Sequence, residues 1–125
     1  MIRCFHVAIV MAVVALVLLP FQLAGILLNN RLQRIVPNLF HRTACAVIGI
    51  RITQVGERTR ESPVLILSNH ASWLDIIVLG AIAPVVFVAK SEVANWPLFG
   101  QLAKLQRTVF VERERRHKTG DAARA

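Results

Sequence analysis

The chain has 125 residues, 55% of them hydrophobic, and a mean hydropathy of +0.56, so we expect one modest globular core with appendages. Its net charge of +8 favours an anionic partner, whether lipid headgroups, phosphorylated substrates or nucleic acid. Its two cysteines, Cys4 and Cys45, lie far apart with no C-x-x-C pair, which supports neither a disulfide framework nor a zinc site, so we expect no metal.

Residues 1–30 form an apolar leader with one basic residue and no acidic one. An unbroken run of 13 apolar residues occupies 7–19, and after Pro20 and Gln22 the apolar character resumes to Leu28. As a helix, residues 7–28 would be about 33 Å long, enough to cross the core of a bilayer. We expect a membrane anchor or a re-entrant helix bent at Pro20, because proline removes a backbone donor. A cleaved signal peptide fits less well, since no small-x-small site follows.

Basic residues follow the leader at Arg31, Arg34 and Arg42. By the positive-inside rule, the body after residue 30 lies in the cytoplasm. We therefore expect attachment to a bacterial-type inner (cytoplasmic) membrane, with the body of the chain on the cytoplasmic side.

Three helices are predicted after the leader. Pro37 starts one that runs to about Ile48, with Gly49 as its terminating glycine. Residues 73–82 are apolar on nearly every side, which indicates a buried helix. A third begins at Pro97, where Leu98, Leu102 and Leu105 form an apolar stripe.

Strands are predicted between these helices, where β-branched or continuous apolar residues are bounded by turn-forming clusters. They occupy 50–55, 64–67, 85–89 and 108–111. Strands that alternate with helices imply an α/β fold, in which a partial mixed sheet with helices packed on it follows the N-terminal membrane helix.

The organisation we expect has three parts. Residues 1–30 are the membrane anchor or re-entrant helix, and 31–116 are the folded body. Residues 117–125 belong to a charged end with no apolar face, so we expect them to form a loose tail.

A polar turn at 68–72 followed by Asp75 is the most unusual local feature. A histidine such as His70 can take a proton from a hydroxyl, and a carboxylate can fix its tautomer and stabilise the imidazolium. Histidine and carboxylate are two members of a hydrolase triad, and here the substrate would supply the nucleophile. Residues five apart on one helix diverge by about 140°, so His70 and Asp75 can pair only if His70 precedes the helix and the chain bends back. The helix N-terminus would then offer N–H donors to a developing oxyanion.

The same residues admit a structural interpretation. Ser72-x-x-Asp75 matches a capping box, in which the serine caps the first turn and the acid reaches back to the chain. His70 would then be an ordinary polar loop residue. The chemistry of the residues alone leaves both interpretations open.

Several blocks resemble one family. Leu67-Ser-Asn-His-Ala-Ser-Trp-Leu-Asp75 is similar to the N-H-x-x-x-x-D signature of glycerolipid acyltransferases of the 1-acylglycerol-3-phosphate acyltransferase family. Other blocks follow that family in order and together cover about residues 45–116: Gly49-Ile-Arg-Ile with Gly56, Val88-Ala-Lys-Ser-Glu92, Trp96-Pro-Leu-Phe-Gly100 and Phe110-Val-Glu-Arg113. A bare H-x4-D is weak by itself, whereas ordered blocks are specific.

The resemblance implies that His70 is a general base, which removes the proton of a lysolipid hydroxyl so that the oxygen attacks an acyl thioester, either acyl-CoA or acyl-carrier protein. Asp75 would orient and polarise His70, and Asn69 would shape the turn. Arg113 would contact the anionic part of the acceptor, since a guanidinium fits phosphate geometry. Lys90 is a weaker candidate for the same role. The implied reaction converts 1-acylglycerol-3-phosphate to phosphatidate, with no cofactor beyond the donor substrate.

The chain also departs from this family. An E-G-T-R-like third motif and a proline-containing fourth motif do not occur, and the sequence ends 12 residues after Arg113. We therefore expect a fragment or a prematurely terminated product with uncovered sheet edges. We do not expect this polypeptide alone to turn over substrate at a normal rate.

Two alternatives remain open at this point. The acceptor could instead be a lyso-ornithine lipid, or the chain could be a non-catalytic, membrane-anchored module that binds anionic lipid. Membrane lipids are expected partners in every case. We expect no nucleic-acid partner, because aromatic residues make up only 6% of the chain and none lies in a basic stacking surface.

Overall fold

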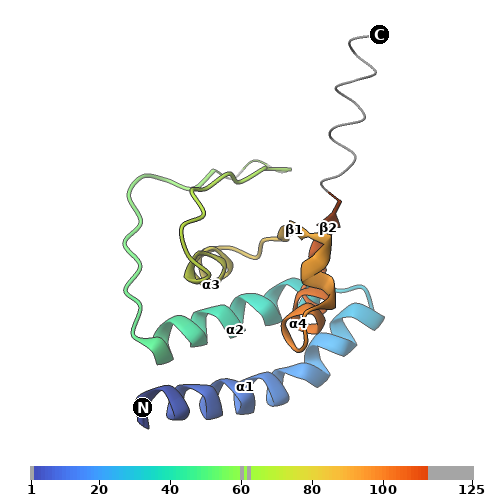
Figure 1. The fold of residues 1–125 in the computed structure, drawn as a ribbon. Coiled ribbons are helices and arrows are strands. Elements are labelled where there is room, and N and C mark those ends of the chain that lie inside the picture. Colours follow the sequence, from blue (N-terminus) through green and yellow to red (C-terminus); the bar gives the residue numbers. More distant parts are fainter. Residues whose placement is uncertain (1, 60, 62, 113–125) are drawn as a thin grey trace.

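The computed structural model describes residues 2–59, 61 and 63–112. Its elements in chain order are α1 (Ile2–Leu27), α2 (Leu32–Ile48), α3 (Leu74–Ile82), β1 (Val88–Lys90), the 3-10 helix η1 (Ser91–Asn95), α4 (Phe99–Leu105) and β2 (Val109–Val111). In Figure 1, α2 lies between α1 and α3, while α4 and the two strands gather at one end of this helical layer. The fold is thus mainly helical, with one small sheet.

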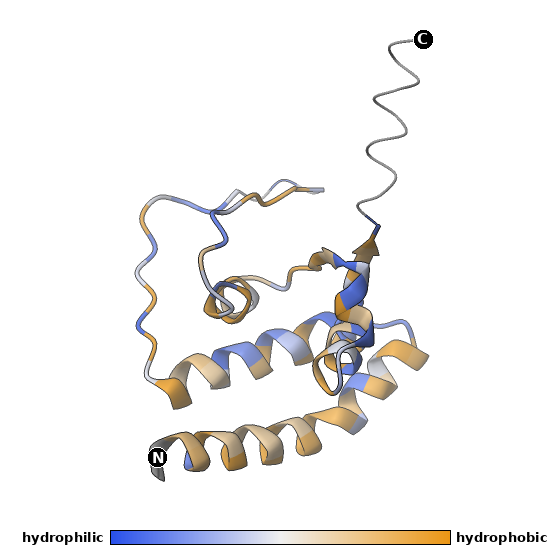
Figure 2. Ribbon diagram, in the orientation of Figure 1, coloured by the Kyte–Doolittle hydropathy of each residue, from blue (hydrophilic) through white to orange (hydrophobic). Residues whose placement is uncertain are grey.

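Helix α1 carries the apolar leader, and many of its large apolar side chains are exposed. Large exposed hydrophobic residues run along it, including Phe5, Leu16 and Leu27, and the ribbon of Figure 2 has hydrophobic colours along most of this helix. Within it, Cys4–Leu27 is long and apolar enough to cross a membrane. Pro20 lies inside the helix, which bends in its second half (Figure 1). The structure also packs α1 against α2, which runs back antiparallel to it.

Helix α2 starts at Leu32, so the prediction that Pro37 begins it is wrong. A proline inside a helix removes the hydrogen bond to the carbonyl four residues earlier, which is that of Gln33. A side chain of α1 compensates, because Gln22 Nε2 donates to the Gln33 oxygen at 3.3 Å. The predicted end of the helix is confirmed: Gly49 has φ 88°, and its N–H donates to the Cys45 oxygen.

Residues 50–73 contain no helix or strand among those described, so the strands predicted at 50–55 and 64–67 are wrong. A strand exists only through hydrogen bonds to a neighbouring strand. Within the described part of the chain, neither segment has one. The apolar side chains of 64–67 are therefore largely exposed, as Leu65 at 79% and Leu67 at 85% illustrate.

The sheet has two parallel strands, β1 and β2, in the register Val88↔Val109, Ala89↔Phe110 and Lys90↔Val111. Parallel neighbours need a crossover, which η1 and α4 provide. The predicted strands at 85–89 and 108–111 are located correctly, although only three residues of each form the ladder. The expected partial mixed sheet is accordingly corrected to this two-stranded parallel one.

The other predicted helices are found close to their expected positions: α3 begins one residue after Trp73, and α4 begins two residues after Pro97.

The interface between α2 and α3 contains polar side chains of α2. His41 is 4% exposed, and its ring lies so close to Gly80 that a Cβ there would sit 2.4 Å from His41 Cδ2. Asn38 Nδ2 donates to the main-chain oxygens of Gly80 (2.6 Å) and Ala81 (3.1 Å). These contacts hold α3, and with it the turn that precedes α3.

Candidate active site

The polar turn lies directly before α3 and brings His70 next to Asp75. The chain bends back, as the five-residue spacing requires, and His70 Nδ1 lies 3.2 Å from Asp75 Oδ2. Asp75 is the second residue of α3, whereas His70 lies outside the helix. The pairing predicted from the sequence is thus present.

The same carboxylate oxygen is held by the main chain. The N–H groups of Ala71 and Ser72 both donate to Asp75 Oδ2 at 2.8 Å. These bonds, that from Ser72 above all, lower the pKa of Asp75 below its ordinary value, and the bond and charge of His70 act in the same direction. Asp75 is therefore a carboxylate at neutral pH, with a fixed orientation.

The capping-box interpretation is realised only in part. The bond from the Ser72 N–H is the reach-back contact that such a box requires of its acid. The serine hydroxyl, however, accepts from the Leu74 N–H at 3.3 Å, while the Asp75 N–H donates to the Ser72 carbonyl. One carboxylate thus stabilises the turn and contacts the imidazole, so the two interpretations are compatible.

This arrangement defines which histidine nitrogen is available. An ionised carboxylate can only accept, so His70 Nδ1 carries the proton and Nε2 is left as the acceptor. The His70 side chain is 65% exposed and that of Asp75 is 30% exposed. The imidazole is therefore open to a substrate on one side and oriented on the other, which is the geometry of a base for a hydroxyl group.

The other candidate residues do not join this pair. Asn69 is exposed in the turn, and no hydrogen bond of its side chain is found within the described part of the chain. Lys90, on β1, places Nζ 2.7 Å from Glu92 Oε1 in an exposed ion pair. Arg113 lies outside the described residues. Among the residues that the structure describes, no group of three or more His, Cys, Asp or Glu side chains could hold a metal ion.

The capping-box spacing predicts the contact from the Ser72 N–H to Asp75, whereas the second main-chain donor, the Ala71 N–H, was not predicted. Both donors lie in the turn before α3 and bind the side chain of Asp75. The capping-box spacing from Ser72 to Asp75 was the available signal, since it requires an acid that turns back toward the preceding residues.

Comparison with known proteins places this turn in a family. Residues 49–125 match the family model described as Acyltransferase. The chain is 51% identical over 118 residues to a lyso-ornithine lipid O-acyltransferase of Brucella abortus, an alignment that covers 94% of this chain and 44% of that relative. A lyso-ornithine lipid O-acyltransferase of Rhizobium meliloti is 48% identical over 110 residues, which cover 88% of this chain and 38% of the relative.

A 1-acyl-sn-glycerol-3-phosphate acyltransferase of Neisseria gonorrhoeae is 42% identical over 65 residues, or 50% of this chain and 26% of the relative. No solved structure gives a significant match. The chain spans less than half the length of these relatives. The family match nevertheless includes more than half of this chain, with both His70 and Asp75. The chain therefore belongs to the acyltransferase family.

Proposed function

We propose that this chain supplies the base-bearing part of an enzyme that transfers an acyl group from a thioester to the hydroxyl of a lysolipid. The observation that carries the proposal is the contact between His70 Nδ1 and Asp75 Oδ2, which leaves Nε2 of an exposed imidazole as a proton acceptor. Membership of the acyltransferase family supports the same chemistry.

In the proposed reaction, His70 Nε2 takes the proton of the acceptor hydroxyl while the oxygen attacks the thioester carbonyl. An ester C–O bond forms and the C–S bond breaks. The thiolate leaves and receives the proton back from His70, so the base is regenerated. Asp75 stabilises the transient imidazolium and keeps its ring oriented. Acyl-CoA or acyl-carrier protein would be the donor, and the reaction needs no other cofactor.

For the acceptor we propose a lyso-ornithine lipid first. The relatives that carry this name are 51% and 48% identical over 118 and 110 residues. The Neisseria gonorrhoeae 1-acyl-sn-glycerol-3-phosphate acyltransferase is 42% identical over only 65. Lysophosphatidate is the second candidate, and Arg113 would then contact its phosphate. In either case we place the reaction at the cytoplasmic face of the inner membrane, where α1 anchors the chain.

A chimera tests the proposal directly. This chain replaces the matching segment of 118 residues in the Brucella abortus relative, and membranes that contain the chimera receive an acyl thioester with either lyso-ornithine lipid or lysophosphatidate. We expect acylation of lyso-ornithine lipid. Loss of a general base costs about 10²- to 10⁴-fold in rate, so the His70→Ala chimera should be reduced by that factor.

Two results would contradict the proposal. If His70→Ala left the rate unchanged, His70 would not be the base. Acylation of lysophosphatidate alone would eliminate the lyso-ornithine acceptor while leaving the chemistry intact. Asn69→Ala is the neighbouring control, because Asn69 is exposed and we assign it no proton transfer. It should retain most of the activity.

A further inference from the structure

A second polar feature lies at the opposite end of α3 from Asp75. It is a cavity of about 250 Å³ between α2, the connection from α3 to β1, and the C-terminal end of α4. Its polar lining comes mainly from Gln33, Arg34, Asn38, His41, Gln106 and Arg107. Its lining on α3 is Gly80, near the last turn, and the nine residues of that helix extend about 13 Å. The cavity is therefore separate from the His70 turn.

Arg107 occupies a backbone conformation that normally selects glycine. Its φ is 59°, and it ends α4 in a Schellman motif: its own N–H donates to the Lys104 oxygen at 2.9 Å, and the Thr108 N–H donates to the Ala103 oxygen at 3.0 Å. An arginine at this position is unfavourable for the backbone. Non-glycine residues in such conformations cluster at functional sites, and the side chain held here is the Arg107 guanidinium.

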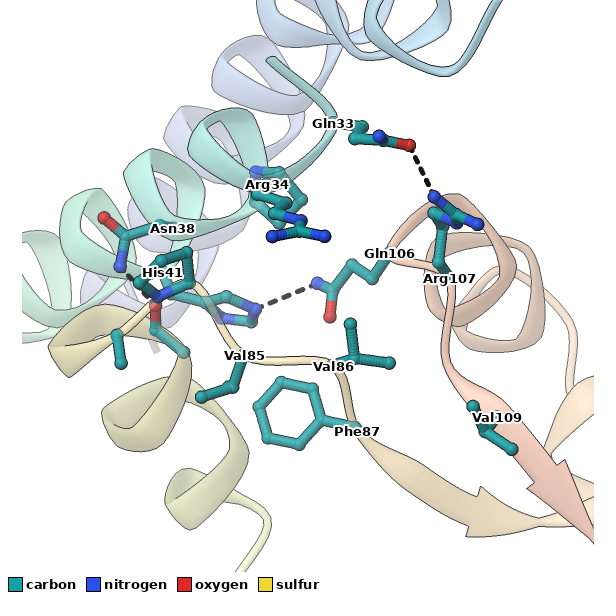
Figure 3. A pocket seen from close by; sticks show the side chains of 14 residues that line it. Gln33, Arg34, Asn38, His41, Val85, Val86, Phe87, Gln106, Arg107 and Val109 are labelled. Atoms are coloured by element: carbon teal, nitrogen blue, oxygen red, sulfur yellow. Dashed lines mark hydrogen bonds between the residues drawn. The ribbon is translucent and has the colours of Figure 1, made fainter. Parts of the chain in front are cut away.

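That guanidinium is positioned at the cavity by a residue from a distant part of the sequence. Arg107 Nη1 donates to Gln33 Oε1 of α2 at 2.8 Å. Arg34 is the next residue after Gln33 on α2, and its side chain extends toward the wall that Gln106 and Arg107 form (Figure 3). Both arginines are exposed to solvent, so a ligand can reach them.

Among the described residues, no acidic side chain pairs with these two positive charges. The cavity lining contains no Asp or Glu, and within the described residues neither Arg34 nor Arg107 forms an ion pair. The third titratable lining group, His41, has its pKa lowered by burial and is neutral at pH 7. Two guanidinium groups that face one cavity repel each other, and an anion between them would remove this repulsion.

We propose that the Arg34–Arg107 cavity binds an oxyanion of the phosphate class, a phosphate mono- or diester group. The guanidinium fork matches the geometry of such an oxyanion. A volume of about 250 Å³ accommodates one phosphate group with ordered water, since a water molecule takes up about 30 Å³ of the liquid. The site goes beyond the proposed acyl transfer, because none of its residues belongs to the His70 turn.

Titration with inorganic phosphate tests the site on the whole chain in uncharged detergent micelles. Calorimetry should show binding that weakens by about tenfold or more in Arg34→Gln and in Arg107→Gly, since hydrogen bonds to charged groups are lost. Arg42→Gln is the matched control: it removes one exposed positive charge from the same helix but does not line the cavity. It should change the affinity by less than about twofold. Equal weakening in all three variants, or in none, would overturn the proposal.

Arg107→Gly also separates binding from folding. Glycine is the preferred residue at this helix end, so the variant removes the guanidinium while it relieves the backbone. Its thermal unfolding midpoint should stay close to that of the parent chain. Retained phosphate affinity in this well-folded variant would exclude Arg107 from the site and overturn the pairing with Arg34.

A second arm identifies the source of the phosphate. Retention on phosphatidylglycerol vesicles is compared with retention on phosphatidylcholine vesicles for the parent, Arg34→Gln and Arg42→Gln. If Arg34→Gln selectively loses the preference for phosphatidylglycerol, the ligand is a lipid headgroup. If the arginines affect only inorganic phosphate, the ligand is a soluble phosphate ester. Both results support the site. If the arginine substitutions change binding in neither arm, the proposal is overturned. The acylation assay of the chimera depends on His70, so the two proposals fail separately.

Discussion

Gln22 of α1 donates a hydrogen bond from Nε2 to the main-chain oxygen of Gln33, the carbonyl whose helical partner Pro37 removes. The same amide nitrogen donates at 2.6 Å to the oxygen of Leu105, at the end of α4. Gln22 is 5% exposed. A single polar side chain in the apolar leader therefore joins three helices, which explains how α2 continues through an internal proline.

Replacement of Gln22 should destabilise this junction. Gln22→Leu leaves two carbonyl groups without their donor and should lower the free energy of unfolding by about 1–3 kcal/mol. Denaturant unfolding followed by circular dichroism in detergent measures this change. In a Pro37→Ala background, the restored N–H satisfies Gln33, so the cost of Gln22→Leu should be smaller. An identical cost in both backgrounds would contradict the role assigned to the Gln33 carbonyl. The exposed Gln54→Leu should change stability by less than about 0.5 kcal/mol.

Gly80→Ala should disrupt the α2–α3 interface. The new Cβ would lie 2.4 Å from His41 Cδ2, and overpacking of this kind costs about 1–3 kcal/mol. In a His41→Ala background the ring is absent, so the same substitution should cost much less. Gly49→Ala is a useful contrast, because its Cβ would meet nothing within 4 Å while its φ of 88° still penalises alanine. Its cost should be independent of His41, and thermal unfolding of the three single variants and the two double variants distinguishes the two mechanisms.

Asp75 should make stability depend on pH in the acid range. Its pKa in the folded chain is lower than the ordinary value of 3.8, so between the two values the unfolded chain binds more protons. Its stabilising effect is therefore complete above that ordinary value and is lost as pH falls through the lowered one. Asp75→Asn should unfold at a lower temperature than the parent at pH 7, with the difference shrinking below pH 3.8. A difference that stayed constant from pH 7 to pH 2 would argue against a stabilising role for the ionised carboxylate.

The outward face of α1 should govern membrane association. Leu16 is 72% exposed within the segment long enough to cross a membrane. A charged side chain at the centre of a membrane helix costs about 2.5–3.5 kcal/mol, so Leu16→Arg should reduce vesicle affinity by about tenfold or more. Leu16→Met keeps the position apolar and serves as the control. Flotation with phosphatidylcholine vesicles measures both variants, and equal flotation would show that α1 does not enter the bilayer at Leu16.

Much of the candidate site was predictable because its contacts are local. His70 and Asp75 are five residues apart, and helix geometry alone requires a bend between them before they can meet. The helix end at Gly49 and the length of the apolar leader are likewise properties of short stretches of sequence.

Long-range partners decided the rest. Residues 64–67 have the composition of a strand, but composition cannot supply the neighbouring strand that a ladder needs. The continuation of α2 through Pro37 depends on Gln22, 11 residues before the carbonyl that it satisfies. Gln33 and Arg107 meet across 74 residues of sequence to shape the phosphate-sized cavity. The sequence by itself determined the local turns, the helix end and the apolar leader, because neighbouring residues carry that information. Only the tertiary structure decided which distant donor meets which acceptor, because such hydrogen bonds leave no periodic trace in the chain.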